Sequence, residues 1–427
     1  MTSHLWGRSS RAVGRGAPRS PRLRGVSQPH AQEAAPEVAG RGTIPRRMPR
    51  YVERPRQRGR TVLIVLTGIG VALGLVEIVV VAAGAEALEG ARLAIIYALV
   101  PLPVLWFVYW WLDRYEPEPR RYKVAAFVWG GVGAVGIALA VQVLLGETTD
   151  LTQKELATFV APASEEPAKG LFLLLTFLRW RRIIDGFLDG LIVAGLVGLG
   201  FAFVENIGYY ALSYAGGPDV PIAGAEGAAG TFVVRGIASP FAHPLFLSAF
   251  GIALGLAVGI RSKVLKVLVG TLGLAISMVL HGLWNGSASY FGGMGFALTY
   301  FALFVLFVTL AVVAIVARSR QVRTLEHSLS YVAERGWIHP AEIPYLSRFG
   351  YRKQARRHAR RHHGRVAGRI VRRYQRLATE MAFLHDAIMR GQTKPHGVER
   401  TYALLDAMYE LRPALRFPPP LPVAHRR

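Results

Sequence analysis

The sequence predicts an all-α, polytopic membrane bundle of about eight transmembrane helices with a small cytoplasmic helical region at its C-terminal end. Of the 427 residues, 52% are hydrophobic and only 18% are charged, whereas soluble domains carry about a quarter charged residues. The apolar residues form long blocks, and a membrane-spanning helix needs about 20 mostly apolar residues in a row. The net charge of +24 is concentrated at the two ends of the chain, so we expect one membrane domain with basic tails.

The composition divides the chain into three segments. Residues 1–60 carry fourteen Lys or Arg against three Asp or Glu without helical or strand periodicity, which predicts a disordered basic tail. Residues 61–317 hold the apolar blocks and form the expected transmembrane domain. Residues 318–427 carry 23 Lys or Arg against eight Asp or Glu and are expected to be a basic cytoplasmic helical tail. The chain has no cysteine, which excludes a disulfide scaffold, thiolate metal sites and a cysteine nucleophile.

Eight blocks are long enough to span a bilayer. They are residues 61–83, 92–112, 123–145, 158–178, 187–211, 231–260, 264–288 and 295–317. The fourth is the least apolar, because Glu165, Glu166 and Lys169 interrupt it. The sixth contains Pro240 and Pro244, so we expect it to bend or break inside the bilayer.

The loops between these blocks predict the orientation. Residues 113–121, 179–182 and 261–266 are rich in Arg and Lys, whereas 146–156 and 211–230 contain little that is basic. Because basic loops stay on the cytoplasmic side, we expect both termini in the cytoplasm and the protein in the plasma membrane.

The fifth block carries a stripe of small or short residues. They recur every fourth position, at Gly186, Gly190, Ala194, Gly198, Ala202 and Asn206. Such a stripe lets helices approach closely in a membrane, which places this helix at the centre of the bundle.

The C-terminal tail also has helical periodicity. One apolar face is formed by Val366, Ile370, Tyr374, Leu377, Met381, Leu384 and Ile388, at the spacing typical of an amphipathic helix. A second short helix, around 399–411, is expected to fold against it. The intensely basic stretch 351–373 favours docking on anionic membrane lipid over nucleic acid, since it follows a cytoplasmic membrane exit.

Ionisable residues inside membrane helices mark functional sites by default, because their burial is costly without a partner. At 1.5 Å per residue, Glu166, Glu205 and His281 lie at a common depth of about 10 Å from the outer side. This predicts one polar cavity in the outer half of the membrane. The expected catalytic residues are Glu165, Glu166, Glu205, His243 and His281, and the expected supporting residues are Lys169, Asn206, Asn285 and Arg235.

Two chemistries fit these residues, and the sequence does not choose between them. In the first, Glu165 or Glu166 activates water while His and Asn groups stabilise the oxyanion. In the second, His243, His281 and a carboxylate, for which Glu205 is the candidate, bind Zn2+ and another Glu acts as base. An HExxH helix is absent from the sequence, so the metal is not assured. A proton-coupled transporter or a helix-binding scaffold is the non-enzymatic alternative, because transporters also cluster protonatable residues.

The order of the motifs resembles that of the PrsW family of intramembrane proteases, which is related to the type II CAAX prenyl endopeptidases. The similarity covers about residues 100–317 and rests on Glu165-Glu166-x-x-Lys169, Phe201-x-x-x-Glu205-Asn206, the His243 span and His281-x-x-x-Asn285. It implies a metallo- or glutamate-type endopeptidase that makes site-1 cuts in single-pass membrane proteins, typically anti-sigma factors. Glu205 stands where the prenyl endopeptidases have His, and Lys169 where they have Arg, which argues against CAAX substrates.

Overall fold

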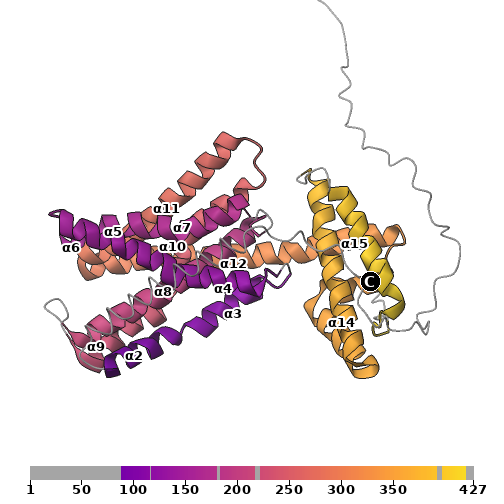
Figure 1. The fold of residues 1–427 in the computed structure, drawn as a ribbon, viewed down its shortest axis with the longest axis horizontal. Helices are drawn as coiled ribbons and strands as arrows, with labels where there is room; N and C mark the ends of the chain where they lie inside the picture. The colour runs from indigo at the N-terminus through magenta and orange to yellow at the C-terminus, as the bar shows by residue number, and fades with distance from the viewer. Residues whose placement is uncertain (1–87, 116, 180–182, 217–221, 392–396, 420–427) are drawn as a thin grey trace, which may run out of the picture. The chain divides into compact units, whose positions relative to one another are not determined.

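The computed structural model describes residues 88–115, 117–179, 183–216, 222–391 and 397–419, and every regular element among them is helical (Figure 1). The helices of the membrane part are α2 (Leu88–Leu99), α3 (Leu102–Leu112), α4 (Arg120–Val128), η1 (Trp129–Ala134), α5 (Val135–Thr148), α6 (Gln153–Glu155), η2 (Leu156–Val160), α7 (Ala161–Arg179), α8 (Phe187–Ala215), α9 (Gly224–Phe232), η3 (Val233–Ala238), α10 (Ala242–Ala257), α11 (Lys263–Tyr290) and α12 (Gly292–Glu334).

Six helical stretches of the described residues are long and apolar enough to cross a membrane, so the protein is a multi-pass membrane protein. They are Leu88–Leu112, Arg120–Thr148, Phe187–Ala215, Gly224–Ala257, Lys263–Tyr290 and Gly292–Glu334. Each corresponds to one expected span. Of the other two, 61–83 lies outside the described residues, and 158–178 corresponds to η2 and α7, which forms a helix but is interrupted by three charged side chains.

Helix α8 is the most buried of the apolar stretches, with 83% of its most apolar window inside the protein. Its small-residue stripe faces α10. A Cβ atom on Gly190 would lie 2.0 Å from the carbonyl oxygen of Gly251, and one on Gly198 would lie 2.7 Å from the backbone nitrogen of Pro244. Since a larger side chain would force these backbones apart, the expected role of the stripe in close helix packing is confirmed.

The other side of α8 meets η1 just as closely. A Cβ atom on Gly130 would lie 1.9 Å from the carbonyl oxygen of Val197, and one on Gly200 would lie 1.9 Å from that of Phe127. Helix α8 therefore has glycine-mediated contacts on two faces, which holds it between α4–η1 and α10.

The sixth expected span is broken, as its prolines predict. The π-helical turn η3 ends at Ala238, Ser239 has the non-helical angles φ −127° and ψ 36°, and α10 begins at Ala242. The helix before the break starts earlier than expected, at Gly224 rather than 231, because the Ala- and Gly-rich stretch packs as α9 against α8 and α2.

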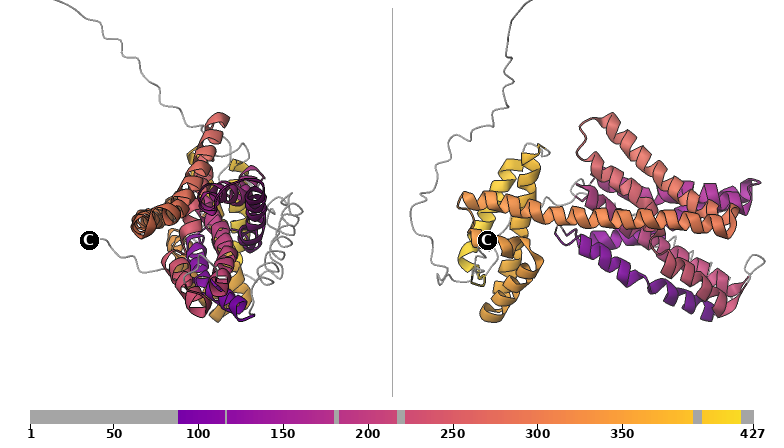
Figure 2. Two further views of the ribbon diagram at one scale, coloured as in Figure 1. Left: turned by 90° about the vertical axis from the view of Figure 1, so that its left-hand side faces the viewer. Right: turned by 180° about the vertical axis from the view of Figure 1, so that it is seen from behind.

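Helix α12 continues beyond its apolar part to Glu334, as Figure 2 shows, and its last turns pack against the C-terminal helices. These are η4 (Pro340–Glu342), α13 (Ile343–Ser347), α14 (Phe349–Met389), α15 (Gly397–Leu411) and η5 (Arg412–Ala414). The labelled helix α14 is two helices joined at Gly364, whose φ of 82° breaks the helical path. The expected apolar face is confirmed: Ile370, Tyr374, Leu377 and Met381 are buried in one core with Leu404 and Met408 of α15.

Candidate active site

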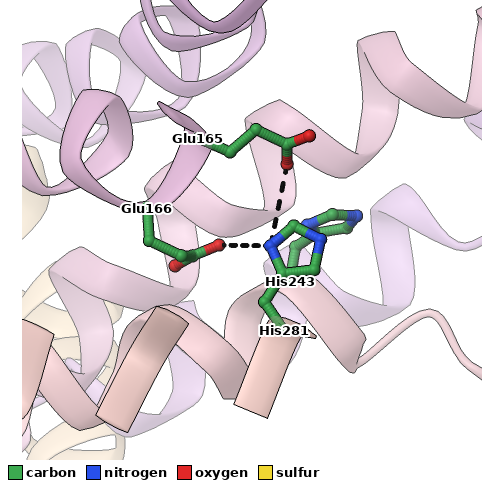
Figure 3. Close-up of side chains that lie close together, drawn as sticks. All are labelled: Glu165, Glu166, His243 and His281. Carbon is green, nitrogen blue, oxygen red and sulfur yellow. Dashed lines mark hydrogen bonds and ion pairs between the residues drawn. The ribbon is translucent and has the colours of Figure 1, made fainter. Parts of the chain in front are cut away.

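Four buried side chains from three helices meet inside the membrane part. Glu165 and Glu166 come from α7, His243 from the start of α10 and His281 from α11 (Figure 3). Each offers one oxygen or nitrogen atom, and these four atoms lie within 4.8 Å of one another. The side chains belong to residues that are 0–7% exposed. Acids and imidazoles far apart in the sequence are thus gathered at one point.

Lys169 lies among these groups one turn further along α7. Its Nζ donates to Glu166 Oε1 at 2.8 Å, to Glu165 Oε2 at 3.1 Å and to His243 Nδ1 at 3.1 Å. It also stands 3.6 Å from the ring centroid of Phe201. Lys169 is fully buried, so its ammonium balances part of the negative charge of the two carboxylates.

Helix α11 contributes a row of polar groups one turn apart. Ser277 Oγ donates to Glu166 Oε2 at 2.6 Å, and His281 Nδ1 lies 3.0 Å from Glu166 Oε1. The amide of Asn285 lies 3.3 Å from His281 Nε2 and donates to the carbonyl oxygen of Ala157 at 2.8 Å. Because a carboxylate only accepts, His281 donates from Nδ1. Glu166 is therefore held on both oxygens and is fixed in place.

His243 is oriented from its other side by Glu205 of α8. His243 Nε2 lies 2.7 Å from Glu205 Oε2, while its Nδ1 faces the ammonium of Lys169. An ammonium only donates and a carboxylate only accepts, so the ring is neutral, with its proton on Nε2 and its Nδ1 lone pair directed into the cluster. Arg235 of η3 completes this arrangement, since it pairs with Glu205 and donates to Asn206 Oδ1 at 2.7 Å.

A small pocket lies beside His243, at the helix break. Its cavity volume is about 20 Å³, room for roughly one water molecule. Asn206, Arg235, Pro240, His243 and Trp284 are among its lining residues. The polar groups that the sequence places around one cavity thus form a buried cluster with a small pocket at one edge.

The donor set fits a divalent metal ion. Carboxylate oxygens and imidazole nitrogens are ordinary zinc ligands. His243 has the arrangement typical of a metal-ligating histidine, because one ring nitrogen donates to a carboxylate while the other presents its lone pair to the site. Glu166, His243 and His281 are the residues that would hold the ion, with Glu165 beside them. His281 would bind through Nδ1 in the tautomer that carries its proton on Nε2. Glu205, which the sequence suggested as a ligand, lies behind His243 as its hydrogen-bond partner.

Two residues of the site were missed from the sequence. Ser277 stands four residues before His281, on the same helical face, and Gln142 is a polar residue inside an apolar block. Gln142 Nε2 donates to Glu165 Oε1 at 3.3 Å. Helical spacing would have identified Ser277, and the rule that polar groups in membrane helices need a partner would have identified Gln142.

The comparisons with known proteins give one family match. Residues 118–315 match the sequence profile described as PrsW family intramembrane metalloprotease. No curated protein and no solved structure matches the chain. The matched range contains all four clustered side chains and makes this chain an enzyme, a membrane-embedded protease, rather than the transporter or scaffold that the sequence left open. The family that residues 118–315 match is therefore the PrsW family of intramembrane metalloproteases.

Proposed function

We propose that Glu165, Glu166, His243 and His281 form the catalytic centre of an endopeptidase that hydrolyses peptide bonds of membrane-protein substrates. The observation that carries this proposal is the convergence of their four donor atoms within 4.8 Å in a buried site. Enzymes that activate water commonly use buried acidic and basic side chains that lie close together, because such groups can take up and release protons.

The two carboxylates have different surroundings, which supports different roles. Glu166 is completely buried and is held by Ser277, Lys169 and His281. Glu165 contacts Lys169 and the more distant Gln142 amide. Because Glu165 is less restrained, we assign it the general base that takes a proton from water and passes it to the leaving amine. Glu166 and the two histidines then form the fixed part of the site.

Metal binding belongs to the same proposal. When bound, a divalent ion such as Zn2+ would acidify water and polarise the scissile carbonyl. Glu166, His243 and His281 would hold it with Glu165 at its side. Glu205 would keep the His243 proton on Nε2, and Asn285 would fix the ring of His281.

The pocket at the break before α10 brings water-sized space close to the catalytic groups. His243 lines both this pocket and the cluster, so the ring of His243 separates water in the pocket from the catalytic groups. We propose a single-pass membrane protein as substrate, cut on its extracytoplasmic side in a site-1 reaction. An anti-sigma factor is the candidate that the family resemblance suggests.

The basic helices of the C-terminal region suggest a further contact of the same protein. Exposed cationic side chains line α14, among them Lys353, Arg357, Arg360, Arg361 and Arg365. Clusters of this kind bind anionic lipid at about 1 kcal/mol per residue. We propose that this surface lies on the cytoplasmic leaflet of the plasma membrane, with both termini in the cytoplasm.

Proteolysis in reconstituted membranes tests the catalytic assignment. The full chain and a single-pass candidate substrate are placed in liposomes, and the cut fragments are followed over time. Glu166→Gln and His281→Ala should cut at least about a hundredfold more slowly than the wild type, the lower end of what acid–base groups contribute. The control is Glu226→Gln, which removes an exposed carboxylate of α9. Equal rates for Glu166→Gln, His281→Ala and the wild type would overturn the proposal.

A further inference from the structure

Lys169 occupies the centre of the donor set that the proposed function gives to a metal ion. Its Nζ contacts Glu165 Oε2, Glu166 Oε1 and His243 Nδ1 at 2.8–3.1 Å. The first two are the oxygens that also face His281 Nδ1. The lone pairs that a metal ion would need are therefore already directed at an ammonium group.

We propose that Lys169 is a built-in competitor for this site: its ammonium holds the donors together in the metal-free protein and must be displaced when a divalent cation binds. The inference rests on the proposed function, because it takes the same donors as metal ligands. His243 Nδ1 has a single lone pair, which cannot serve a proton donor and a metal ion at once, so ammonium and metal exclude each other at His243. Beside it, the ammonium that contacts Glu166 Oε1 occupies the space that the ion would need.

The charges support the same conclusion. Two carboxylates with Lys169 carry a net charge of −1, and a divalent ion added to them gives +1. Without the lysine, the ion and the two carboxylates would be neutral. Since net charge is costly inside a membrane protein, Lys169 weakens metal binding.

The ammonium also has a partner that a metal ion would not take. The ring of Phe201 lies 3.6 Å from Nζ, and an aromatic face attracts a desolvated cation. The ammonium can therefore leave the oxygen and nitrogen donors by a shift of one flexible side chain and still keep an attractive contact.

Cobalt titration of the full chain tests the proposal. Metal-free protein in detergent is titrated with Co2+, which is followed by its visible absorption, and thermal unfolding is measured without metal. Lys169→Met keeps the length of the side chain and removes its charge. We expect it to bind Co2+ at least about tenfold more tightly than the wild type and to unfold at a lower temperature when metal-free.

Lys123→Met is the matched control, because Lys123 is also a buried lysine but pairs with Asp113, between α3 and α4. It should leave the Co2+ affinity unchanged. Should Lys169→Met fail to fold, Glu165→Gln with Lys169→Met keeps the net charge of the cluster, and it should bind Co2+ about tenfold more tightly than Glu165→Gln alone.

Equal or weaker Co2+ binding after loss of the lysine would overturn the proposal while leaving the metal site intact. Absence of Co2+ binding in every variant and in the wild type would instead overturn the metal-binding part of the proposed function, and the inference with it. The two failures are therefore distinguishable.

Discussion

Substitution of Gly198 by alanine should disturb the catalytic centre through the backbone alone. Gly198 lies on α8 and contacts the first turn of α10. His243 belongs to this turn, and its side chain is part of the cluster. A Cβ atom at this position would stand 2.7 Å from the nitrogen of Pro244 and 2.8 Å from the carbonyl carbon and oxygen of His243. All three neighbours are backbone atoms, so no side chain can rotate away to make room.

The size of the disturbance follows from these distances. Cβ contacts shorter than 3.4 Å are rare, so α10 must move by about 0.7 Å to reach ordinary contact. A movement of that size directed away from α8 stretches the bond between Glu205 and His243 from 2.7 Å to about 3.4 Å, at the limit of a hydrogen bond. Overpacking in a close-packed interior costs about 1–3 kcal/mol. Both stability and the orientation of His243 should therefore suffer.

The assay compares Gly198→Ala with Gly208→Ala, a glycine on the same helix with no atom within 4 Å of its hypothetical Cβ. Gly198→Ala should unfold at a lower temperature and cut substrate at least about tenfold more slowly, because small misplacements of reacting groups cost large factors in rate. Gly208→Ala should keep the wild-type rate and gain up to about 1 kcal/mol from the better helix propensity of alanine. Wild-type cleavage by Gly198→Ala would refute the reasoning.

Two further predictions concern residues at other positions. Glu205→Gln should lower kcat and Co2+ affinity by about 10–100-fold with little change in KM. The control Glu226→Gln, which alters an exposed carboxylate, should leave kcat, KM and Co2+ affinity unchanged. An effect of Glu205→Gln on KM alone would contradict a positioning role. Binding of the full chain to vesicles of anionic lipid should strengthen as the pH falls from 7.5 to 5.5, because the imidazole of His358 on the basic surface gains charge. The pKa of His358 is lowered by its partial burial and by the neighbouring imidazoles of His362 and His363, so the increase falls in the lower part of this pH range. His358→Gln should reduce this pH dependence in a sedimentation assay, and an unchanged pH dependence would count against the basic surface.

The sequence predicted the membrane architecture well because hydropathy acts over whole helices. Blocks of apolar residues gave the positions of six spans, and the stripe at Gly190 and Gly198 gave the face of α8 that meets α10. The expected break near Pro240 is present for a local reason, since proline removes a backbone donor wherever it stands. These features depend on the segment itself and need no knowledge of its neighbours.

The arrangement within the site could not be obtained in this way. The helix rise per residue predicts a similar membrane depth for Glu166, Glu205 and His281. A common depth does not determine which of these side chains face one another. Helix rotation decides that Glu205 approaches His243 from behind, while Glu165 and Glu166 approach from the side of the cluster. The sequence also could not place the Lys169 ammonium between three donors, since its spacing from Glu165 predicts only a pair on one helix.

The balance of buried charges favours one more cation at this site. Three carboxylates, Glu165, Glu166 and Glu205, face two cationic side chains, Lys169 and Arg235, and the hydrogen bonds of the two histidines leave both rings neutral. An uncompensated negative charge in such a place is costly, so either a proton or a metal ion is attracted to it. A proton would make one carboxylic acid ready to donate to a leaving amine, and a metal ion would acidify water. The proton and the metal ion both serve peptide hydrolysis, so one arrangement of side chains is compatible with both chemistries. The identity of the residues does not distinguish the two chemistries, whereas the affinity of the site for a divalent cation does.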